Sequence, residues 1–289
     1  MNRKNVRARM VVDVRVSGEM HAELRGVYAV WLREVKRYLR DKMRLITAVT
    51  APIVWLLLFG VGFSSFFRQS GGINYINFLF PGIIAQSLLF TSVFLGISVI
   101  YDRQFGFLKE MLVAPIKRVS VFSGKMLGGA TDALIQASIV LVLSVFFIPV
   151  QPAMMLACLP IMLLTTIGFV SMSIIIASRL KTLESFGLIM NFVNLPLFFS
   201  SGALFPISSA PGWLQTLGYF NPLTYAVDAM RGLLLGHTVI AFSQTTFLYD
   251  AIRSLLLGNN LFPIWFDLAV LGGFAGIMIL LGAVAFARR

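Results

Sequence analysis

Few side chains in this sequence could take part in chemistry inside an apolar environment. An ionisable residue within a membrane segment marks a functional site by default, and Asp132 is such a residue because it lies within a long apolar run. Asp132 could serve gating or substrate passage, or it could pair structurally with Lys125 or Arg103. The other polar side chains at comparable depth are amides, namely Gln86, Gln136, Asn191 and Asn194.

Motifs for catalysis or metal binding are missing from the sequence. The stretch nearest to a phosphate-binding loop, 123–126, lacks the upstream glycine and the Ser or Thr after the lysine that this loop needs. His21 and His237 lie far apart, and Cys158 is the only cysteine, so a disulfide within the chain is excluded. We therefore predict a chain that is not an enzyme, with no metal and no cofactor of its own.

The composition predicts a membrane protein. Hydrophobic residues make up 58% of the chain and charged residues 12%, about half the share of a typical soluble domain. Since about 20 apolar residues cross a bilayer, the predicted fold class is all-α and polytopic, with six transmembrane helices. The apolar runs lie near 46–66, 79–101, 121–148, 154–177, 186–206 and 264–287.

The basic residues predict the orientation. If the N-terminus is cytoplasmic, all but three of the 24 Lys and Arg lie in segments on the inside, and the exceptions are Arg68, Arg231 and Arg253. The positive-inside rule therefore predicts a multi-pass protein of the cell membrane with both termini in the cytoplasm. This distribution explains the net charge of +12 without a nucleic-acid partner. The polar first 45 residues also predict that no signal peptide is cleaved.

The N-terminal region divides into two parts. Residues 1–26 are basic without periodicity, which predicts a mobile tail. In 27–44, apolar residues recur at spacings of three and four with basic residues between them, which predicts an amphipathic helix in the lipid headgroup layer. The alternative is a helix packed on a soluble partner, and both can hold together. The apolar face consists of Tyr28, Trp31, Val35 and Tyr38.

The stretch 192–236 begins like a transmembrane helix and is interrupted by Pro196, Ser200–Gly202 and Pro206. Asn221 is a good N-cap and Pro222 suits a first helical turn. We therefore predict an external re-entrant helical hairpin at 207–236, with an ordinary extracellular loop as the alternative. Broken backbone at membrane depth is tolerated only where protein buries it or where it lines a wet cavity.

One pair of charges lies within this predicted hairpin. Asp228 and Arg231 are three residues apart on a predicted helix at 222–235, so we expect them to face each other. The spacing favours a structural pair over a contact with substrate.

The connection at 101–118 is too apolar and aromatic for a solvated loop. Gly106 provides a bend and Pro115 ends the helical turn that follows. The pattern predicts a short amphipathic helix on the inner membrane surface that docks a partner. A simple interfacial helix without a partner is the alternative.

Two motifs resemble one known family. The segment DRQFGFLKEMLVAPIKR at 102–118 is similar to the coupling segment of ABC-2 type exporter permeases, with daunorubicin-resistance-like and multidrug-type members as the nearest branch. The stretch 198–236 resembles the outer signature of the same family. The resemblance implies two regions, a cytoplasmic tail with an interface helix at 1–45 and a transmembrane domain at 46–287.

The resemblance also implies the partners. The chain would be the membrane half of an exporter, would form a homodimer, and would bind two copies of a separate ABC ATPase that carries ATP and Mg. Docking would involve the interface helix and the coupling segment, in which Gln104 stands where the family commonly has Glu. The coupling residues would be Arg103, Phe105, Gly106, Phe107, Leu108, Lys109, Glu110, Met111 and Pro115. An external gate or dimer brace would comprise Pro206, Asn221, Pro222, Tyr225, Asp228 and Arg231.

The predicted function is export of an amphipathic or hydrophobic, drug-like or lipid-like substrate. Export of a polysaccharide or lipid-linked glycan is the alternative within the family. An ion-coupled secondary transporter is disfavoured because the chain offers one buried acid and no internal repeat. A membrane enzyme or an assembly factor is disfavoured by the missing catalytic set.

Overall fold

The computed structural model describes residues 3–63, 75–107, 116–148, 150–207, 210–235 and 262–287, and these residues form helices without strands. Six helices in this part of the chain are long and apolar enough to cross a membrane. The predicted all-α class with six spans is therefore confirmed. The spans are Lys42–Val61, Tyr75–Gln104, Arg118–Phe146, Pro152–Arg179, Leu183–Ser200 and Ile264–Phe286.

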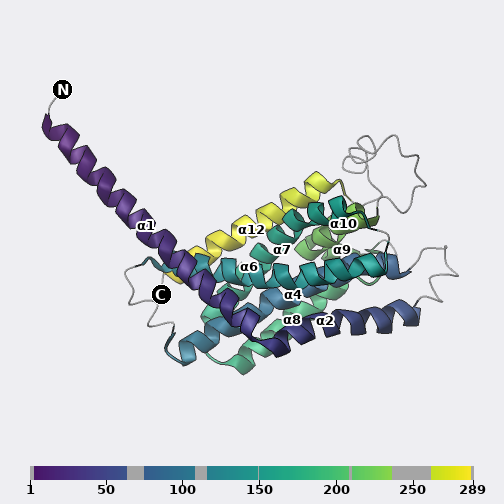
Figure 1. The fold of residues 1–289 in the computed structure, drawn as a ribbon. Helices are drawn as coiled ribbons and strands as arrows, with labels where there is room; N and C mark the ends of the chain where they lie inside the picture. Colours follow the sequence, from purple (N-terminus) through teal and green to yellow (C-terminus); the bar gives the residue numbers. More distant parts are fainter. Residues whose placement is uncertain are drawn as a thin grey trace.

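The spans form a bundle around α4 (Tyr75–Gln104), which packs against α6 (Arg118–Leu143), α7 (Pro152–Arg179) and α8 (Leu183–Ser200). Ser173 of α7 shows how close this packing is, because its Oγ donates to the Val93 carbonyl at 2.8 Å and accepts from the Gly96 amide at 3.0 Å. Figure 1 shows α12 (Ile264–Ala287) along the outside of α7. The central helix α4 is thus enclosed on most sides.

The first span begins as α2 (Lys42–Trp55) and continues as a π-helical stretch at Leu56–Val61. It lies at the periphery of the bundle (Figure 1), and most of its side chains face outward. Its N-terminus is capped by Asp41, whose carboxylate accepts from the Arg44 amide at 3.1 Å.

The N-terminal region is one continuous helix, α1 (Arg3–Arg40), of 38 residues. Residues 3–26 of the predicted mobile tail are therefore helical, and the mobility of this stretch stays a prediction. The first part of α1 extends away from the bundle (Figure 1) and has no core to face there. The sequence of this part therefore has no hydrophobic periodicity from which a helix could be predicted. Its last turns cross α6, so the predicted amphipathic helix packs on the protein itself.

The predicted break after the fifth span is present, but it begins after Pro196. Helix α8 continues through Pro196 and ends at Ser200, so the interpretation of Pro196 as a breaking point is wrong. Membrane helices tolerate proline where neighbouring groups satisfy the freed backbone. The chain turns at Gly202, where φ is +73°. This left-handed region favours glycine because a Cβ would be strained there.

The helical hairpin predicted to be re-entrant follows this turn. It consists of α9 (Gly212–Phe220) and α10 (Pro222–Leu235), and α10 packs against α4, α7 and α12. In Figure 1 this hairpin lies near one end of the bundle, and the C-terminal ends of α4 and α12 lie at the other. We call these the outer and the inner end, in keeping with the orientation predicted above.

Candidate functional site

Two glycines of α6 bring α1 into close contact at the inner end. A Cβ added at Gly124 would lie 2.7 Å from Cβ of Val30, and one added at Gly128 would lie 2.6 Å from Cβ of Glu34. Small residues four apart allow helix backbones to approach in this way. The contact places Lys125, which lies between the two glycines, against α1.

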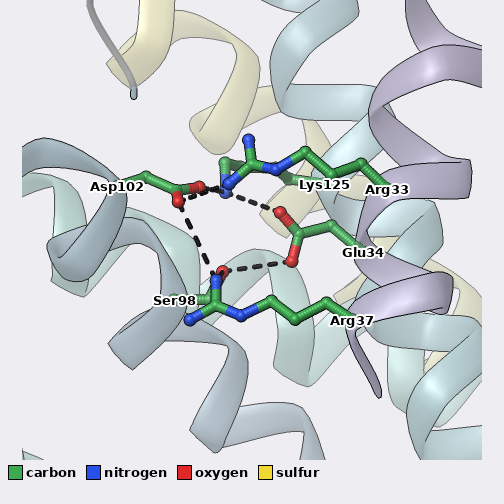
Figure 2. A network of polar contacts seen from close by, with 6 residues as sticks. All are labelled: Arg33, Glu34, Arg37, Ser98, Asp102 and Lys125. Carbon is green, nitrogen blue, oxygen red and sulfur yellow. Dashed lines mark hydrogen bonds and ion pairs between the residues drawn. The ribbon is translucent and has the colours of Figure 1, made fainter. Parts of the chain in front are cut away.

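Lys125 is completely buried between two acids from two other helices, as Figure 2 shows. Its Nζ donates to Oε1 of Glu34 on α1 at 3.0 Å and to Oδ2 of Asp102 on α4. Both carboxylates are only 2% exposed. A buried charge without a partner is strongly destabilising, so each of these three groups depends on the others.

Arg33, Arg37 and Ser98 complete this cluster (Figure 2). We call the whole cluster the charged junction, and its members are Arg33, Glu34, Arg37, Ser98, Asp102 and Lys125. The Ser98 hydroxyl donates to Oε2 of Glu34 at 3.1 Å. The Arg33 guanidinium donates to Oδ1 of Asp102, and Arg37 lies 3.8 Å from the same oxygen. The junction therefore connects α1, α4 and α6 through full charges and leads from the core to the surface.

The start of the predicted coupling segment lies directly beside the junction. Helix α4 ends two residues after Asp102, and Gly106 then adopts a φ of +83°. On either side of it, Phe105 is 68% exposed and Phe107 is 50% exposed. Phe105 stacks on Tyr101 at 5.9 Å between ring centroids, and the Arg33 guanidinium lies 5.8 Å from the Phe107 ring. The predicted coupling residues Leu108, Lys109, Glu110, Met111 and Pro115 lie outside the described residues.

Arg103 contacts the C-terminal end of α7. Its guanidinium donates to the carbonyls of Ser178 at 3.0 Å and Leu180 at 2.8 Å, at the C-terminus of α7. Cations satisfy the last carbonyls of a helix favourably. Arg103 therefore fixes α7 to the end of α4, and its role toward a partner stays a prediction. Gln104 donates to the Lys181 carbonyl at 3.4 Å.

The predicted apolar face of α1 is divided between protein and surroundings. Tyr38 is buried and Val35 is half-buried, whereas Tyr28 is 58% exposed. Trp31 is half-buried, and its Nε1 donates to the Thr131 hydroxyl at 3.0 Å. The face thus serves mainly to pack on α6, with Tyr28 left for the surroundings.

A second polar contact binds α1 to the start of α6, nearer to the N-terminus of α1 than the charged junction. The Glu23 carboxylate accepts from the Ser120 hydroxyl and from the Lys117 amide at 3.0 Å, at the start of α6. The Ser120 hydrogen bond is the largest cause that lowers the pKa of Glu23 below its usual value. The contact therefore favours the ionised form of Glu23, which suits a carboxylate at a helix N-terminus.

Asp132 does not pair with Lys125 or Arg103, so the structural pairing considered above is wrong. Both cations have other partners, at the junction and on α7. Asp132 is buried, and its Oδ1 has no hydrogen-bond partner among the described residues. The hydroxyl of Tyr38 is also without one in this part of the chain. A role for Asp132 in gating or passage stays a prediction.

At the outer end, Asn221 joins the hairpin to α8. Its Oδ1 accepts from the Leu223 amide at 2.9 Å, which confirms the predicted N-cap of α10, with Pro222 as the first helical residue. Its amide nitrogen donates to the Ser200 hydroxyl at 3.0 Å and to the Leu197 carbonyl. Tyr225 donates to the Tyr219 carbonyl at 2.7 Å, so it also links α10 to α9.

Asp228 and Arg231 do not form the ion pair expected from their spacing. The Arg231 guanidinium donates to the Gly202 carbonyl at 2.9 Å and lies 3.8 Å from the Phe78 ring centroid. Oδ2 of Asp228 accepts from the Phe262 amide at 3.0 Å. The prediction is wrong because the breaks before α9 and before α12 free backbone groups that these side chains satisfy. Pro206 lies in the broken stretch, half-buried and outside any helix.

Arg231 keeps its charge in these surroundings, because an arginine guanidinium is not deprotonated in proteins. The residue is half-buried, and its Nε is enclosed without a hydrogen-bond partner among the described residues. The outer end thus contains a partly buried cation whose partners are a carbonyl dipole and an aromatic face.

Comparison with known proteins identifies the family. Residues 25–235 match the family model for the ABC-2 type transporter. The chain belongs to the ABC-2 type transporter family. The match covers α1 from just after Glu23, the charged junction, the coupling segment and the outer hairpin.

Relatives over most of the chain agree with this assignment. The putative transport permease ycf38 of Cyanophora paradoxa is 34% identical over 79% of this chain and 80% of its own length. Nodulation protein J of Rhizobium leguminosarum bv. trifolii is 27% identical over 75% and 84%. The inner membrane transport permease YadH of Escherichia coli K12 is 25% identical over 75% and 86%.

This ABC-2 protein is therefore a multi-pass membrane permease subunit of an ABC transporter, a family whose members work with an ABC ATPase. Its relatives are named transport permeases, which agrees with the prediction that this chain is a transporter subunit and not an enzyme. These three relatives carry transport or nodulation names, so the drug-resistance branch stays a prediction.

The junction acids and the role of Lys125 were missed in the sequence of this permease. Glu34 is the only acid in 27–40, and it lies four residues from both Val30 and Tyr38, on the buried face. An acid on the apolar face of a basic helix is a signal for a buried cation partner. Lys125, inside an apolar run and close to glycines, is the matching signal on α6.

Proposed function

We propose that this permease exports an amphipathic or hydrophobic, drug-like or lipid-like substrate from the cytoplasm. In this proposal it works as a homodimer with both termini in the cytoplasm. Two copies of a separate ABC ATPase, which carry ATP and Mg, drive it. The observation that supports docking best is the exposure of Phe105 and Phe107 on either side of Gly106. Exposed aromatic side chains that insert into a partner's groove are typical interface anchors.

Movement of this docking point would be passed on through the charged junction. Asp102 lies three residues before Phe105 and is bound to Lys125, which is bound to Glu34. Separating these buried charges costs more free energy than moving their helices together. A displacement of the coupling segment should therefore move α1, α4 and α6 as one unit.

Helix α4 reaches from this unit to the outer hairpin. At the outer end of α4, the Tyr75 hydroxyl donates to the Leu204 carbonyl at 3.0 Å. The backbone of Ala203 packs directly against Gly82, where a Cβ would clash with it. The broken stretch after α8 thus rests on the same helix that carries Asp102. We infer that the hairpin is a gate at the exit or a brace of the dimer, moved by α4.

Substitutions at Gly106 test the docking role. The observed φ of Gly106 is +83°. Gly106→Pro is incompatible with it, because the proline ring fixes φ at about −65°. Gly106→Asn is the matched control, because Asn tolerates the left-handed region. Both variants would be reconstituted with the ATPase in liposomes, and substrate-stimulated ATP hydrolysis and export would be measured.

We expect Gly106→Pro to abolish stimulation and Gly106→Asn to retain most of it, with both variants present in the membrane. The resemblance predicts the same loss for Leu108→Asp. Unchanged coupling in the proline variant would refute the docking role. ATP-driven accumulation of substrate on the cytoplasmic face would refute export, and a monomer mass for the active complex would refute the homodimer.

A further inference from the structure

A groove of about 930 Å³ lies between α1 and the inner end of α4. One wall is basic and consists of Arg33, Lys36, Arg37 and Arg40, which follow one another on the same side of α1. The opposite wall is aromatic and includes Tyr101 and Phe105. The groove is open to the surroundings, and Asp102 of the charged junction also forms part of its lining.

The basic wall has more positive charge than the protein neutralises. Arg33 and Arg37 lie close to Asp102, but Lys125 shares that carboxylate. The side chains of Lys36 and Arg40 make no hydrogen bond or ion pair with other described residues. A groove with uncompensated cations beside an apolar wall fits a ligand that is anionic at one end and apolar at the other.

The position of the groove along the bundle indicates where such a ligand comes from. Arg40 lies two residues before the first span begins, and Tyr101 is in the last turn of the second span. Both walls therefore lie where membrane helices meet the headgroup layer, the level at which Tyr and basic side chains are enriched. Anionic phospholipids attract basic segments at this level.

We propose that this groove binds the headgroup of an anionic phospholipid. Lys36, Arg37 and Arg40 contact the phosphate and the rest of the anionic headgroup, and the apolar part of the lipid lies against Tyr101. The site needs neither the ATPase nor the transported substrate, so its test is independent of the function proposed above. An acidic segment of the ATPase is the competing occupant.

The test uses the full-length permease, purified without the ATPase. Native mass spectrometry would compare its binding of phosphatidylglycerol, which is anionic, with that of phosphatidylcholine, which has no net charge. The variant is Lys36→Gln with Arg40→Gln, because these two cations have no role in the junction. The control is Arg25→Gln with Lys181→Gln, which removes the same charge from exposed residues outside the groove.

We expect the wild type to prefer phosphatidylglycerol. The groove variant should lose roughly 25-fold in affinity for it, at about fivefold per cation near an anionic surface. The control should lose much less, and Lys36→Arg with Arg40→Lys should retain most of the affinity. Thermal unfolding in a detergent without anionic groups should be the same for all variants.

Three results would overturn the proposal. The groove variant could keep the preference of the wild type, or the control could lose as much as the groove variant, which would indicate general surface charge. In a separate binding assay with the purified ATPase, the groove variant could also weaken ATPase binding while phosphatidylglycerol binding stays unchanged, which would assign the groove to the ATPase.

Discussion

The two ends of this permease surround charged side chains in different ways. At the inner end, Lys125 is enclosed by the carboxylates of Glu34 and Asp102 from two other helices. At the outer end, Arg231 is held by the Gly202 carbonyl and the Phe78 ring. The difference follows from the backbone. Continuous helices satisfy their own carbonyls, so a charge between them needs an opposite charge, whereas a broken helix offers carbonyls to a side chain.

The largest expected effect is at the inner end. Lys125→Met should lower the free energy of unfolding by about 3–5 kcal/mol, because it leaves two buried carboxylates without their shared cation. Thermal unfolding of the purified permease measures this loss. Lys181→Met, at an exposed site, is the control and should have little effect. Adding Glu34→Gln and Asp102→Asn should recover part of the stability, and a fully stable Lys125→Met variant would contradict the role of the junction.

At the outer end, the expected loss is smaller, because the partners of Arg231 are dipoles. Arg231→Met should cost about 1–3 kcal/mol, since the buried Gly202 carbonyl loses its donor. Arg231→Lys should have an intermediate stability, because an ammonium keeps the charge but has neither the planar fork nor the stacking on Phe78. Thermal unfolding in the same detergent would rank the three proteins. A loss as large as that of Lys125→Met would remove the contrast between the two ends.

The cap of α10 should have a smaller effect again. Asn221→Ala should cost about 1 kcal/mol, which is typical for a lost N-cap. The cause is that the Leu223 amide loses its acceptor. Asn191→Ala is the matched control, since Asn191 is exposed on α8. Hydrogen exchange should show faster opening of the first turn of α10 in Asn221→Ala only, and equal exchange in both variants would argue against the capping role.

The smallest effect on stability is expected for Asp132→Asn. Oδ1 of Asp132 has no hydrogen-bond partner to lose among the described residues, and Asn has the same shape. Thermal unfolding should therefore be unchanged or slightly higher. Transport measured on the same variant decides the role of the acid, because a loss of export at full stability would indicate gating or passage. Strong destabilisation would reveal a structural partner instead.

Local patterns in the sequence predict the spans, the hairpin and its cap well. Each of these features depends on a continuous apolar run or on residues adjacent in the sequence, such as Asn221 and Pro222. The charged junction depends on helices that are far apart in the chain, so no spacing rule relates Glu34 to Lys125. Asp228 and Arg231 show the opposite error. Their spacing is right for a pair, but the carbonyls and amides freed by the chain breaks compete for both side chains.

The glycine contact between α1 and α6 has a consequence for the order in which the permease assembles. Glu34 precedes the six spans described above, and Asp102 precedes Lys125, so both acids are synthesised before their common cation. Until the third span is inserted and Gly124 and Gly128 meet α1, neither acid has the lysine it needs for burial. The junction therefore closes only when α1, α4 and α6 are all in place, so its closure is a late step in the assembly of these helices.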